Sequence, residues 1–440
     1  MATFFIENFG CRATAADAAA LYGALVADGW RPVSEPAGAD LVVLNTCTVT
    51  AAADSQARDA LRKIHGANPG ARIVVSGCYA QRAPEEVAAI EGVEWVVGNS
   101  HQARIPQILR ENPAIRAGKD FLSLAELGGD DLSLARGPAK ILTGDIFAQS
   151  AVQVAPAAQI AFDRTRPILK IQDGCNHRCS YCVIPLVRGR SRSLPPDEVV
   201  RQARALSDAG AKEIVLSGIN LGSYGGDLSP RVELQGIVRR ILEETVVDQI
   251  RFSSIEPQHV TEDFVALVAS ERRIARHFHI PLQSGSDRIL RAMGRWYRST
   301  HYAERLALIC RRLPDAALGA DVIVGFPGEA DADFRATQEF IERLPFTYLH
   351  VFSFSERPGT AAAALAGRVP PQTIRERARA LRELGQQKSA TFRAAQQGCT
   401  MRALTLARGG SDWTEALTGN YLRVPVPGRH PANQWREVTI

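Results

Sequence analysis

Apolar runs and helix-like stretches alternate over the first 112 residues of the chain. The apolar runs are short, and longer segments rich in Ala and Leu separate them. The runs are Phe4–Ile6, Leu41–Leu44, Arg72–Val75 and Trp95–Val97. Strands that alternate with helices are typical of a parallel sheet covered by helices. The pattern therefore predicts an open parallel α/β domain over residues 1–112.

The same alternation returns between residues 168 and 355. Helix-like stretches such as 196–209 and 299–313 separate six apolar runs. The runs are Ile168–Ile171, Glu213–Leu216, Ile250–Ser253, His277–Ile280, Asp321–Val324 and His350–Phe352. Six strand–helix repeats predict a partial (β/α)6 barrel, whose active site would lie at the carboxyl ends of the strands. A doubly wound sheet is the competing topology, and periodicity alone does not separate the two.

The remaining segments predict a four-part organisation. Residues 113–162 are irregular and rich in Gly, Gln, Ala and Pro in places, which predicts a linker between the first domain and a barrel domain at 163–392. Residues 393–440 show short alternating runs and turn residues, which predict a small C-terminal β-barrel. The helix-like segment 368–402 crosses this boundary and carries eight Lys or Arg residues against two Glu residues.

The composition is that of an ordinary globular protein, with 440 residues of which 45% are hydrophobic and 22% are charged. It excludes disordered, collagen-like and small disulfide-rich classes. Glu7 stands where a secretory signal would need an apolar run, and the longest uncharged stretch, 146–162, is too polar to span a bilayer. A cytoplasmic protein without membrane attachment is expected. In that compartment cysteine groups more often bind metals or act in catalysis than form disulfides.

Three of the eight cysteines fall within eight residues, at Cys175, Cys179 and Cys182, directly after a predicted strand. A loop this short can wrap one compact metal centre, and thiolates are the ligands of iron–sulfur clusters. Three ligands would leave one iron of a 4Fe–4S cluster without a protein partner. The alternatives are a zinc site completed by His177 or a distant residue, or free cysteines. The absence of a second nearby ligand pair favours the cluster.

Three further cysteines, Cys11, Cys47 and Cys78, each follow one of the first predicted strands within a few residues. The carboxyl ends of parallel strands share one crevice, where ligands bind, so these thiols are expected to converge in space. Taken alone, each could be a small core residue. Their common position at strand ends favours a second cluster. Cys310 and Cys399 have no comparable partners, and we assign them no role.

These residues resemble those of a known family. The Cys175–Cys182 loop is similar to the signature of radical S-adenosylmethionine enzymes. Its flanks and the settings of the three N-terminal cysteines resemble the methylthiotransferase branch of that superfamily. The similar stretches are 9–11, 45–50, 76–81, 163–166, 170–174, 184–185, 188–193, 279–286 and 321–329. The resemblance covers nearly the whole chain.

Residues 45–50, 350–355 and 357–360 look most like the bacterial threonylcarbamoyladenosine tRNA methylthiotransferases. Relatives that modify isopentenyladenosine in tRNA, or an aspartate of a ribosomal protein, usually differ beside the second cysteine. Thr14 departs from the pattern, since the family usually has Asn three residues after the first cysteine. Residues 418–421 are similar to the small RNA-binding β-barrel called TRAM.

The resemblance implies two 4Fe–4S clusters and two molecules of S-adenosylmethionine. One cluster, on Cys175, Cys179 and Cys182, would bind S-adenosylmethionine and start a radical reaction at an adenine carbon. The other, on Cys11, Cys47 and Cys78, would hold the sulfur that is methylated and transferred. The implied partners are the anticodon region of tRNA and an electron donor such as flavodoxin or ferredoxin, with the enzyme a monomer. The alternatives are a methylthiotransferase that acts on isopentenyladenosine in tRNA or on a ribosomal protein, and a non-enzymatic zinc-stabilised RNA-binding protein.

Contacts to the cofactor are expected from Tyr181 and from polar residues at the strand ends. The candidates are Tyr181, Ser217, Gly218, Asn220, Ser254, Glu256 and Gln283. Loop packing is an equal alternative for Tyr181, and each of the others could be an ordinary turn residue. Arginine suits phosphate contact, so Arg188, Arg190 and Arg192 and the basic segment 368–402 are expected to face RNA.

Overall fold

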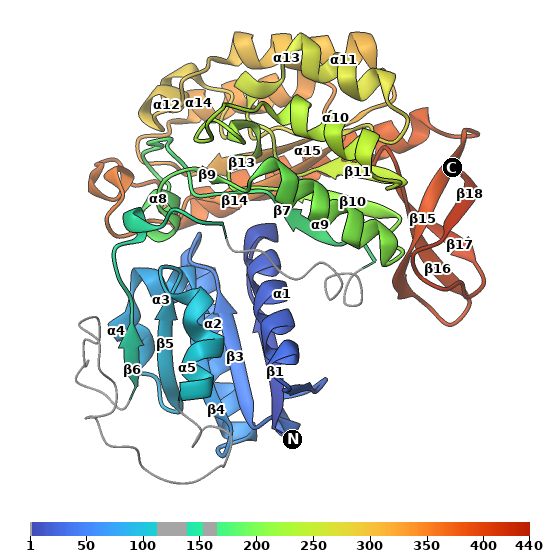
Figure 1. Cartoon of the computed structure of the whole chain (residues 1–440). Coiled ribbons are helices and arrows are strands. Elements are labelled where there is room, and N and C mark those ends of the chain that lie inside the picture. The colour runs from blue at the N-terminus through green and yellow to red at the C-terminus, as the bar shows by residue number, and fades with distance from the viewer. Residues whose placement is uncertain (1, 112–138, 153–164) are drawn as a thin grey trace.

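The computed structural model describes residues 2–111, 139–152 and 165–440. The predicted boundaries at 112–113 and 162–163, and most of the predicted linker, lie outside these ranges. Figure 1 shows the first region below the larger second region, with the last strands at one side. Among the described residues no helix is both long and apolar enough to span a membrane.

The first region is built on a parallel sheet with the strand order β2-β1-β3-β4-β5-β6. Its central strand β3 is buried at every position, which is typical of a parallel sheet covered on both faces. The strands are β1 (Thr3–Asn8), β2 (Arg31–Pro32), β3 (Leu41–Thr46), β4 (Arg72–Gly77), β5 (Val93–Gly98) and β6 (Lys140–Leu142). The helices are α1 (Arg12–Ala27), α2 (Ala51–Ala67), α3 (Cys78–Arg82), α4 (Pro84–Ala88) and α5 (Ile105–Glu111).

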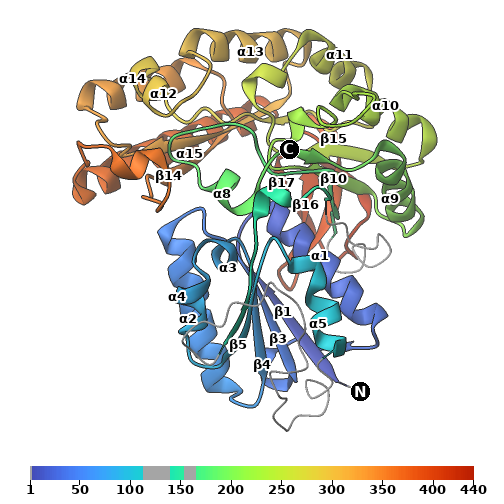
Figure 2. The same ribbon diagram turned by 60° about the vertical axis from the view of Figure 1, so that its left-hand side comes forward.

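The helices cover both faces of this sheet (Figure 2). Helices α1 and α5 pack on one face, where Leu21 and Ile108 join a core with Val43 and Trp95 of the strands. Helices α2, α3 and α4 pack on the other face in a separate core. The open parallel α/β arrangement predicted for this region is confirmed. Strands β2 and β6 were not predicted, because the first has two residues and the second falls in the segment expected to be a linker.

The second region contains six parallel strands that neighbour one another in chain order, β7-β10-β11 and then β12-β13-β14. A parallel bridge between Ser254 and His279 joins the two groups. A doubly wound sheet would reverse its strand order part-way, so the structure decides for the partial barrel. The strands are β7 (Ile168–Lys170), β10 (Glu213–Ser217), β11 (Gln249–Phe252), β12 (His277–His279), β13 (Ala317–Val324) and β14 (Tyr348–Ser353).

Helices follow most of the barrel strands and bury one apolar stripe each against them. Helix α9 shows the local reason, because Val199, Val200, Ala203 and Leu206 recur at helical spacing and are all buried. The helices are α8 (Ile184–Arg188), α9 (Pro196–Asp208), α10 (Leu234–Glu244), α11 (Glu262–Ser270), α12 (Asp287–Ala292), α13 (Ser299–Arg312), α14 (Asp331–Arg343) and α15 (Pro371–Ala395). A two-stranded ribbon of β8 (Gln172–Asp173) and β9 (Arg192–Ser193) lies beside the cysteine loop.

The last strands form a curled antiparallel half-barrel in the order β17-β16-β15-β18. They are β15 (Thr400–Gly409), β16 (Trp413–Thr418), β17 (Arg423–Pro427) and β18 (Trp435–Thr439). The buried Arg251 pairs with Glu213 and donates to the carbonyls of Thr418 and Gly419, and the ring of Tyr421 stacks on His277 at 4.2 Å. The 418–421 stretch therefore docks the half-barrel onto the central barrel.

Candidate active site

The three N-terminal cysteines lie together at one edge of the first sheet. Cys11 begins α1 just after β1, Cys47 follows β3 directly, and Cys78 begins α3 after β4. Strands β1 and β3 are neighbours at the point where the strand order reverses, which is the usual ligand crevice of an open α/β sheet. The expected convergence of these three strand ends is found.

Glycines allow the backbone to approach these thiols closely. Gly10 has φ +117°, and a Cβ there would lie 2.4 Å from the Cβ and 3.0 Å from the Sγ of Cys47. Gly77 has φ +99° and ψ −160°, a conformation that is essentially restricted to glycine, and its Cβ would lie 2.4 Å from the carbonyl oxygen of Thr46. Both glycines are therefore required for the turns that carry Cys11 and Cys78.

Thr14, which departs from the family pattern, is fully buried one turn into α1. Its hydroxyl donates to the carbonyl of Cys11 at 2.8 Å, and its own carbonyl accepts from Nδ2 of Asn45 at 2.6 Å. Its side chain thus fixes the backbone of Cys11 rather than reaching toward the other thiols.

Burial favours the protonated thiol at Cys47 and Cys78. Desolvation raises the pKa of Cys47 to about 12, and it also raises the pKa of Cys78. A buried thiolate needs a nearby positive charge or a metal, and metal binding displaces the proton. The chemistry of this donor set fits a metal cluster.

The second trio lies in the loop between β8 and α8, and its three cysteines are half-buried free thiols. Burial raises the pKa of Cys175 to about 11 and that of Cys182 to about 12. Nη1 of Arg295 donates to Sγ of Cys179 at 3.2 Å, and Arg295 also pairs with Glu256. The sequence analysis missed Arg295, because it lies more than a hundred residues from the loop and no local motif marks it.

The spacing of the sulfur atoms argues against a single zinc ion at either trio. Four ligands at 2.3 Å around tetrahedral zinc lie about 3.8 Å apart. Within the described ranges, one group of three potential ligand residues has its ligand atoms within 4.8 Å of one another, and it contains no cysteine. His177, the candidate fourth zinc ligand, instead faces Gln258 at 3.2 Å. Within the described ranges neither cysteine trio forms such a compact group.

A cavity of about 190 Å³ lies between the first region and the barrel. Its lining includes Val49 and Thr50, just after Cys47, and Cys182 of the second trio. The other lining residues are Tyr181, Val183, Ile184, Gln283, Asp321, Ile323, Phe352, Ser353, Phe354 and Ser355. Cys78 packs against Val183 and Val187, so the two cysteine loops also meet directly beside this cavity.

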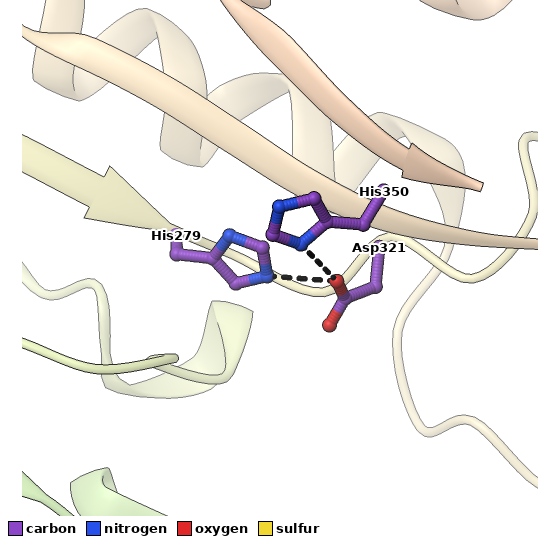
Figure 3. Close-up of side chains that lie close together, drawn as sticks. All are labelled: His279, Asp321 and His350. Carbon is purple, nitrogen blue, oxygen red and sulfur yellow. Dashed lines mark hydrogen bonds and ion pairs between the residues drawn. The ribbon is translucent and has the colours of Figure 1, made fainter. Parts of the chain in front are cut away.

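A polar group that sequence reasoning missed reaches this cavity through Asp321. Nε2 of His279 lies 2.9 Å and Nδ1 of His350 lies 3.2 Å from the same Asp321 oxygen (Figure 3). On its other side, His279 contacts the hydroxyl of Tyr348 at 3.0 Å. These hydrogen bonds lower the pKa of Asp321 although the carboxylate is largely buried. Two imidazoles and a carboxylate are also a ligand set that suits divalent transition metals.

The seven residues expected to contact the cofactor fall into two places. Tyr181 and Gln283 line the cavity, and Gln283 adopts a left-handed backbone with φ +68°. The others lie at the carboxyl ends of β10 and β11 and do not line it: Ser217, Gly218, Asn220, Ser254 and Glu256. Oδ1 of Asn220 is buried and has no hydrogen-bond partner in the described part of the chain, and Glu256 is connected to the second trio through Arg295.

The structure corrects the expected role of two arginines. Arg188 and Arg192 are buried, and both pair with Asp173, so they are not available to contact RNA phosphates. Arg190 is exposed. In the basic segment Arg377 is likewise buried against Glu329, whereas its neighbours on α15 point outward: Arg375, Arg379 and Arg382. The error arose because the acidic partners lie far away in the sequence.

Comparison with known proteins extends this picture. Residues 169–341 match the model of the radical SAM superfamily, and residues 3–98 match a model described as uncharacterized protein family UPF0004. A threonylcarbamoyladenosine tRNA methylthiotransferase MtaB of Aquifex aeolicus is 36% identical over 96% of both chains. The chain belongs to the radical S-adenosylmethionine methylthiotransferase family. A tRNA-2-methylthio-N(6)-dimethylallyladenosine synthase of Syntrophobacter fumaroxidans is 35% identical over 83% of this chain and 76% of its own.

Solved structures agree on the fold. The radical S-adenosylmethionine methyltransferase TsrM from Kitasatospora setae has a TM-score of 0.57 over 82% of this chain and 77% of its own, at 16% sequence identity. As a radical S-adenosylmethionine methylthiotransferase the protein is an enzyme, a transferase that uses a 4Fe–4S cluster and S-adenosylmethionine. This assignment replaces the non-enzymatic alternative.

Proposed function

We propose that this enzyme methylthiolates the adenine of N6-threonylcarbamoyladenosine beside the anticodon of tRNA. We propose further that it uses two 4Fe–4S clusters and two molecules of S-adenosylmethionine. One observation carries the proposal: Val49 and Thr50, just after Cys47, line the same cavity as Cys182 of the second trio, and Cys78 packs against Val183 where the two regions meet. The similarity to the Aquifex enzyme over nearly both full lengths supports this substrate.

Each trio would hold one cluster through its three thiols. When bound, the clusters supply single-electron transfer to S-adenosylmethionine and a site for the sulfur that is transferred. The chain itself binds and orients these groups. Arg295 donates to Sγ of Cys179 while it pairs with Glu256, which fixes the cluster loop against the barrel. The carbonyl of Met293 and the amide of Ser180 join the same loop to the end of α12 at 2.9 Å.

S-adenosylmethionine would lie across the carboxyl ends of the barrel strands. The unpartnered Oδ1 of Asn220 is available for one of its polar groups, and Gln283 presents its side chain to the cavity from a strained backbone. Ser217, Gly218, Ser254 and Glu256 lie at neighbouring strand ends. Tyr181 supplies an apolar ring beside the cluster loop, where it can pack against an adenine.

The cavity wall is mostly apolar, which would limit the contact of water with a substrate bound there. Val49, Ile184, Ile323 and Phe354 line it, and a low-dielectric lining protects a radical step from side reactions. Asp321, held by His279 and His350, is the anionic group within reach of a substrate base there. The mode of RNA binding would combine the exposed arginines of α15 with the C-terminal half-barrel.

The choice between the two tRNA substrates is tested by nucleoside mass spectrometry. A strain that lacks the gene should lose the methylthio group from threonylcarbamoyladenosine and keep it on isopentenyladenosine, and the wild-type gene should restore it. A Cys179→Ala variant should fail to restore it, whereas Cys399→Ala should succeed, because Cys399 is exposed and remote from both trios. Loss of the methylthio group from isopentenyladenosine alone would assign the second substrate. If both modifications persist, intact masses of the ribosomal proteins would test the protein target.

The partners follow from this chemistry. The enzyme would receive single electrons from a donor such as flavodoxin or ferredoxin and act as a monomer on tRNA. Reconstitution without oxygen should load about four irons per trio. Full iron content with either trio replaced by alanine would contradict the two-cluster proposal.

A further inference from the structure

A buried group of charged side chains joins the two regions directly behind the N-terminal cysteines. Asp17, from the second turn of α1, pairs with Lys170 of β7 and with Nη2 of Arg188 at 2.8 Å. Asp173 of β8 pairs with Lys170 at 3.0 Å and with Nη1 of Arg188 at 3.1 Å. All four side chains are at most 5% exposed. The group therefore connects the helix that starts at Cys11 with the strand that leads to Cys175.

This group carries more positive than negative charge. Arg192, also buried, lies 3.6 Å from Asp173 and otherwise donates to backbone carbonyls. Three cations thus face two carboxylates, an excess of one positive charge among largely buried side chains. Unbalanced buried charge is costly, so a negative group is expected close by. A 4Fe–4S centre in its oxidised state, held by three thiolates, carries one negative charge overall.

Arg188 is the cation of this group that directly follows Val187, a residue in contact with Cys78. Its pairs with Asp17 and Asp173 occupy Nη1 and Nη2, but Nε is fully buried and has no hydrogen-bond partner among the residues that the structure describes. The preceding residue, Val187, packs against Cys78, and Nδ2 of Asn99 bridges the Val187 carbonyl at 2.8 Å and the Cys78 sulfur at 3.4 Å. In keeping with this position, the guanidinium lowers the pKa of Cys47 and of Cys78 against the larger effect of burial.

We infer that Arg188 is a positioning residue for the N-terminal cluster, and that its unpartnered Nε and its charge are directed at the cluster and make it easier to reduce. This inference rests on the proposed function, since it assumes a cluster on Cys11, Cys47 and Cys78. A cation or a hydrogen-bond donor beside an iron–sulfur cluster stabilises the more negative, reduced form. Because Asp17 holds the same arginine, the setting of the cluster also depends on the contact between the two regions.

The test isolates the N-terminal cluster in a full-length chain that carries Cys175→Ala, Cys179→Ala and Cys182→Ala. In this background Arg188→Gln is compared with Arg192→Gln, which removes one buried positive charge from the same group but from a side chain that donates to carbonyls. Each variant is analysed for iron content and melting temperature. Electron paramagnetic resonance then measures the reduced fraction of the cluster, at the potential where the background protein is half reduced. Arg188→Gln should lower the ratio of reduced to oxidised cluster about tenfold, equivalent to about 59 mV for a one-electron couple. Arg192→Gln should change it much less.

The double variant Asp17→Asn/Arg188→Gln is used if Arg188→Gln fails to fold. It removes one charge of each sign, so Asp17 is not left as a buried carboxylate without its arginine. It should show a smaller fall in the reduced fraction than Arg188→Gln, because the loss of the Asp17 carboxylate partly offsets the loss of the Arg188 charge. Full iron with an unchanged ratio in a folded Arg188 variant would overturn the inference and leave the two-cluster proposal intact. An equal fall in Arg192→Gln would show a general effect of charge and would also overturn it. A background protein without iron would overturn both.

Discussion

The turn at Gly77 offers a direct test of how the N-terminal cysteines are brought together. A Cβ at residue 77 would lie 2.4 Å from the carbonyl oxygen and 2.6 Å from the amide nitrogen of Thr46, and neither atom belongs to a flexible side chain. Gly77→Ala must therefore push the end of β4 away from the end of β3. Since Cys47 follows β3 and Cys78 follows Gly77, the displacement separates two thiols of one trio.

Gly29→Ala is the matched control for this change. Gly29 also has a positive φ, +82°, and lies in the same region, but a Cβ there meets nothing within 4 Å. Gly29→Ala should lower the free energy of unfolding by about 1–2 kcal/mol, because alanine disfavours the left-handed backbone. For Gly77→Ala the glycine-only conformation costs about 1–3 kcal/mol and the steric clash about 1–3 kcal/mol more. The expected loss of stability is thus about 2–6 kcal/mol.

Iron analysis and thermal unfolding of the reconstituted protein would measure both effects. Gly77→Ala should lose about half of its iron, while the Cys175–Cys182 trio keeps its share. Gly29→Ala should keep all of it, with a smaller fall in melting temperature. The reasoning is wrong if Gly77→Ala retains full iron and is no less stable than Gly29→Ala.

Three further outcomes are expected. Arg251→Met should lower the free energy of unfolding by about 3–5 kcal/mol and expose the C-terminal half-barrel to proteolysis, because it leaves Glu213 buried without its main partner. In the control variant Arg276→Met, which removes the exposed pair with Asp315, the loss should be less than about 1 kcal/mol. Equal melting temperatures of the two variants would contradict this prediction. Burial lowers the pKa of His277 below its value in the unfolded chain, which is near 6.5. The unfolded chain therefore takes up the proton at a higher pH than the folded protein does. As a result, the free energy of unfolding falls as the pH drops below 6.5, by at most about 1.4 kcal/mol per pH unit. Melting curves of His277→Asn between pH 7 and 5 should show a shallower slope than the wild type, and an identical slope would exclude His277. Finally, the exposed arginines Arg375, Arg379 and Arg382 of α15 are replaced by alanine. These variants should bind tRNA more weakly without loss of iron, and the slope of log affinity against log salt concentration should become shallower by about 0.9 per lost phosphate contact. An unchanged slope would show that the RNA does not contact these arginines.

The sequence alone was sufficient for the alternation of the longer strands and helices and for grouping the cysteines by their positions after strands. Apolar runs mark buried parallel strands, and residues just after such strands must come to one edge of the sheet. Cys11, Cys47 and Cys78 could therefore be grouped although they are far apart in the chain. The short strands β2 and β6 escaped this reasoning, because two or three residues give no periodic signal.

Only the tertiary structure decided which polar residues face solvent and which face one another. The sequence around Arg188 and Arg192 predicts an exposed basic loop. In the structure, however, Arg188 is buried and forms ion pairs with Asp17 and Asp173. Arg295 donates to Cys179, and Asp321 pairs with His279 and His350, although the partners in each pair are far apart in the sequence. Local periodicity records whether a position is apolar, and it carries no information about the distant partner that lets a charge be buried. That partner is set by how the first region and the barrel pack together.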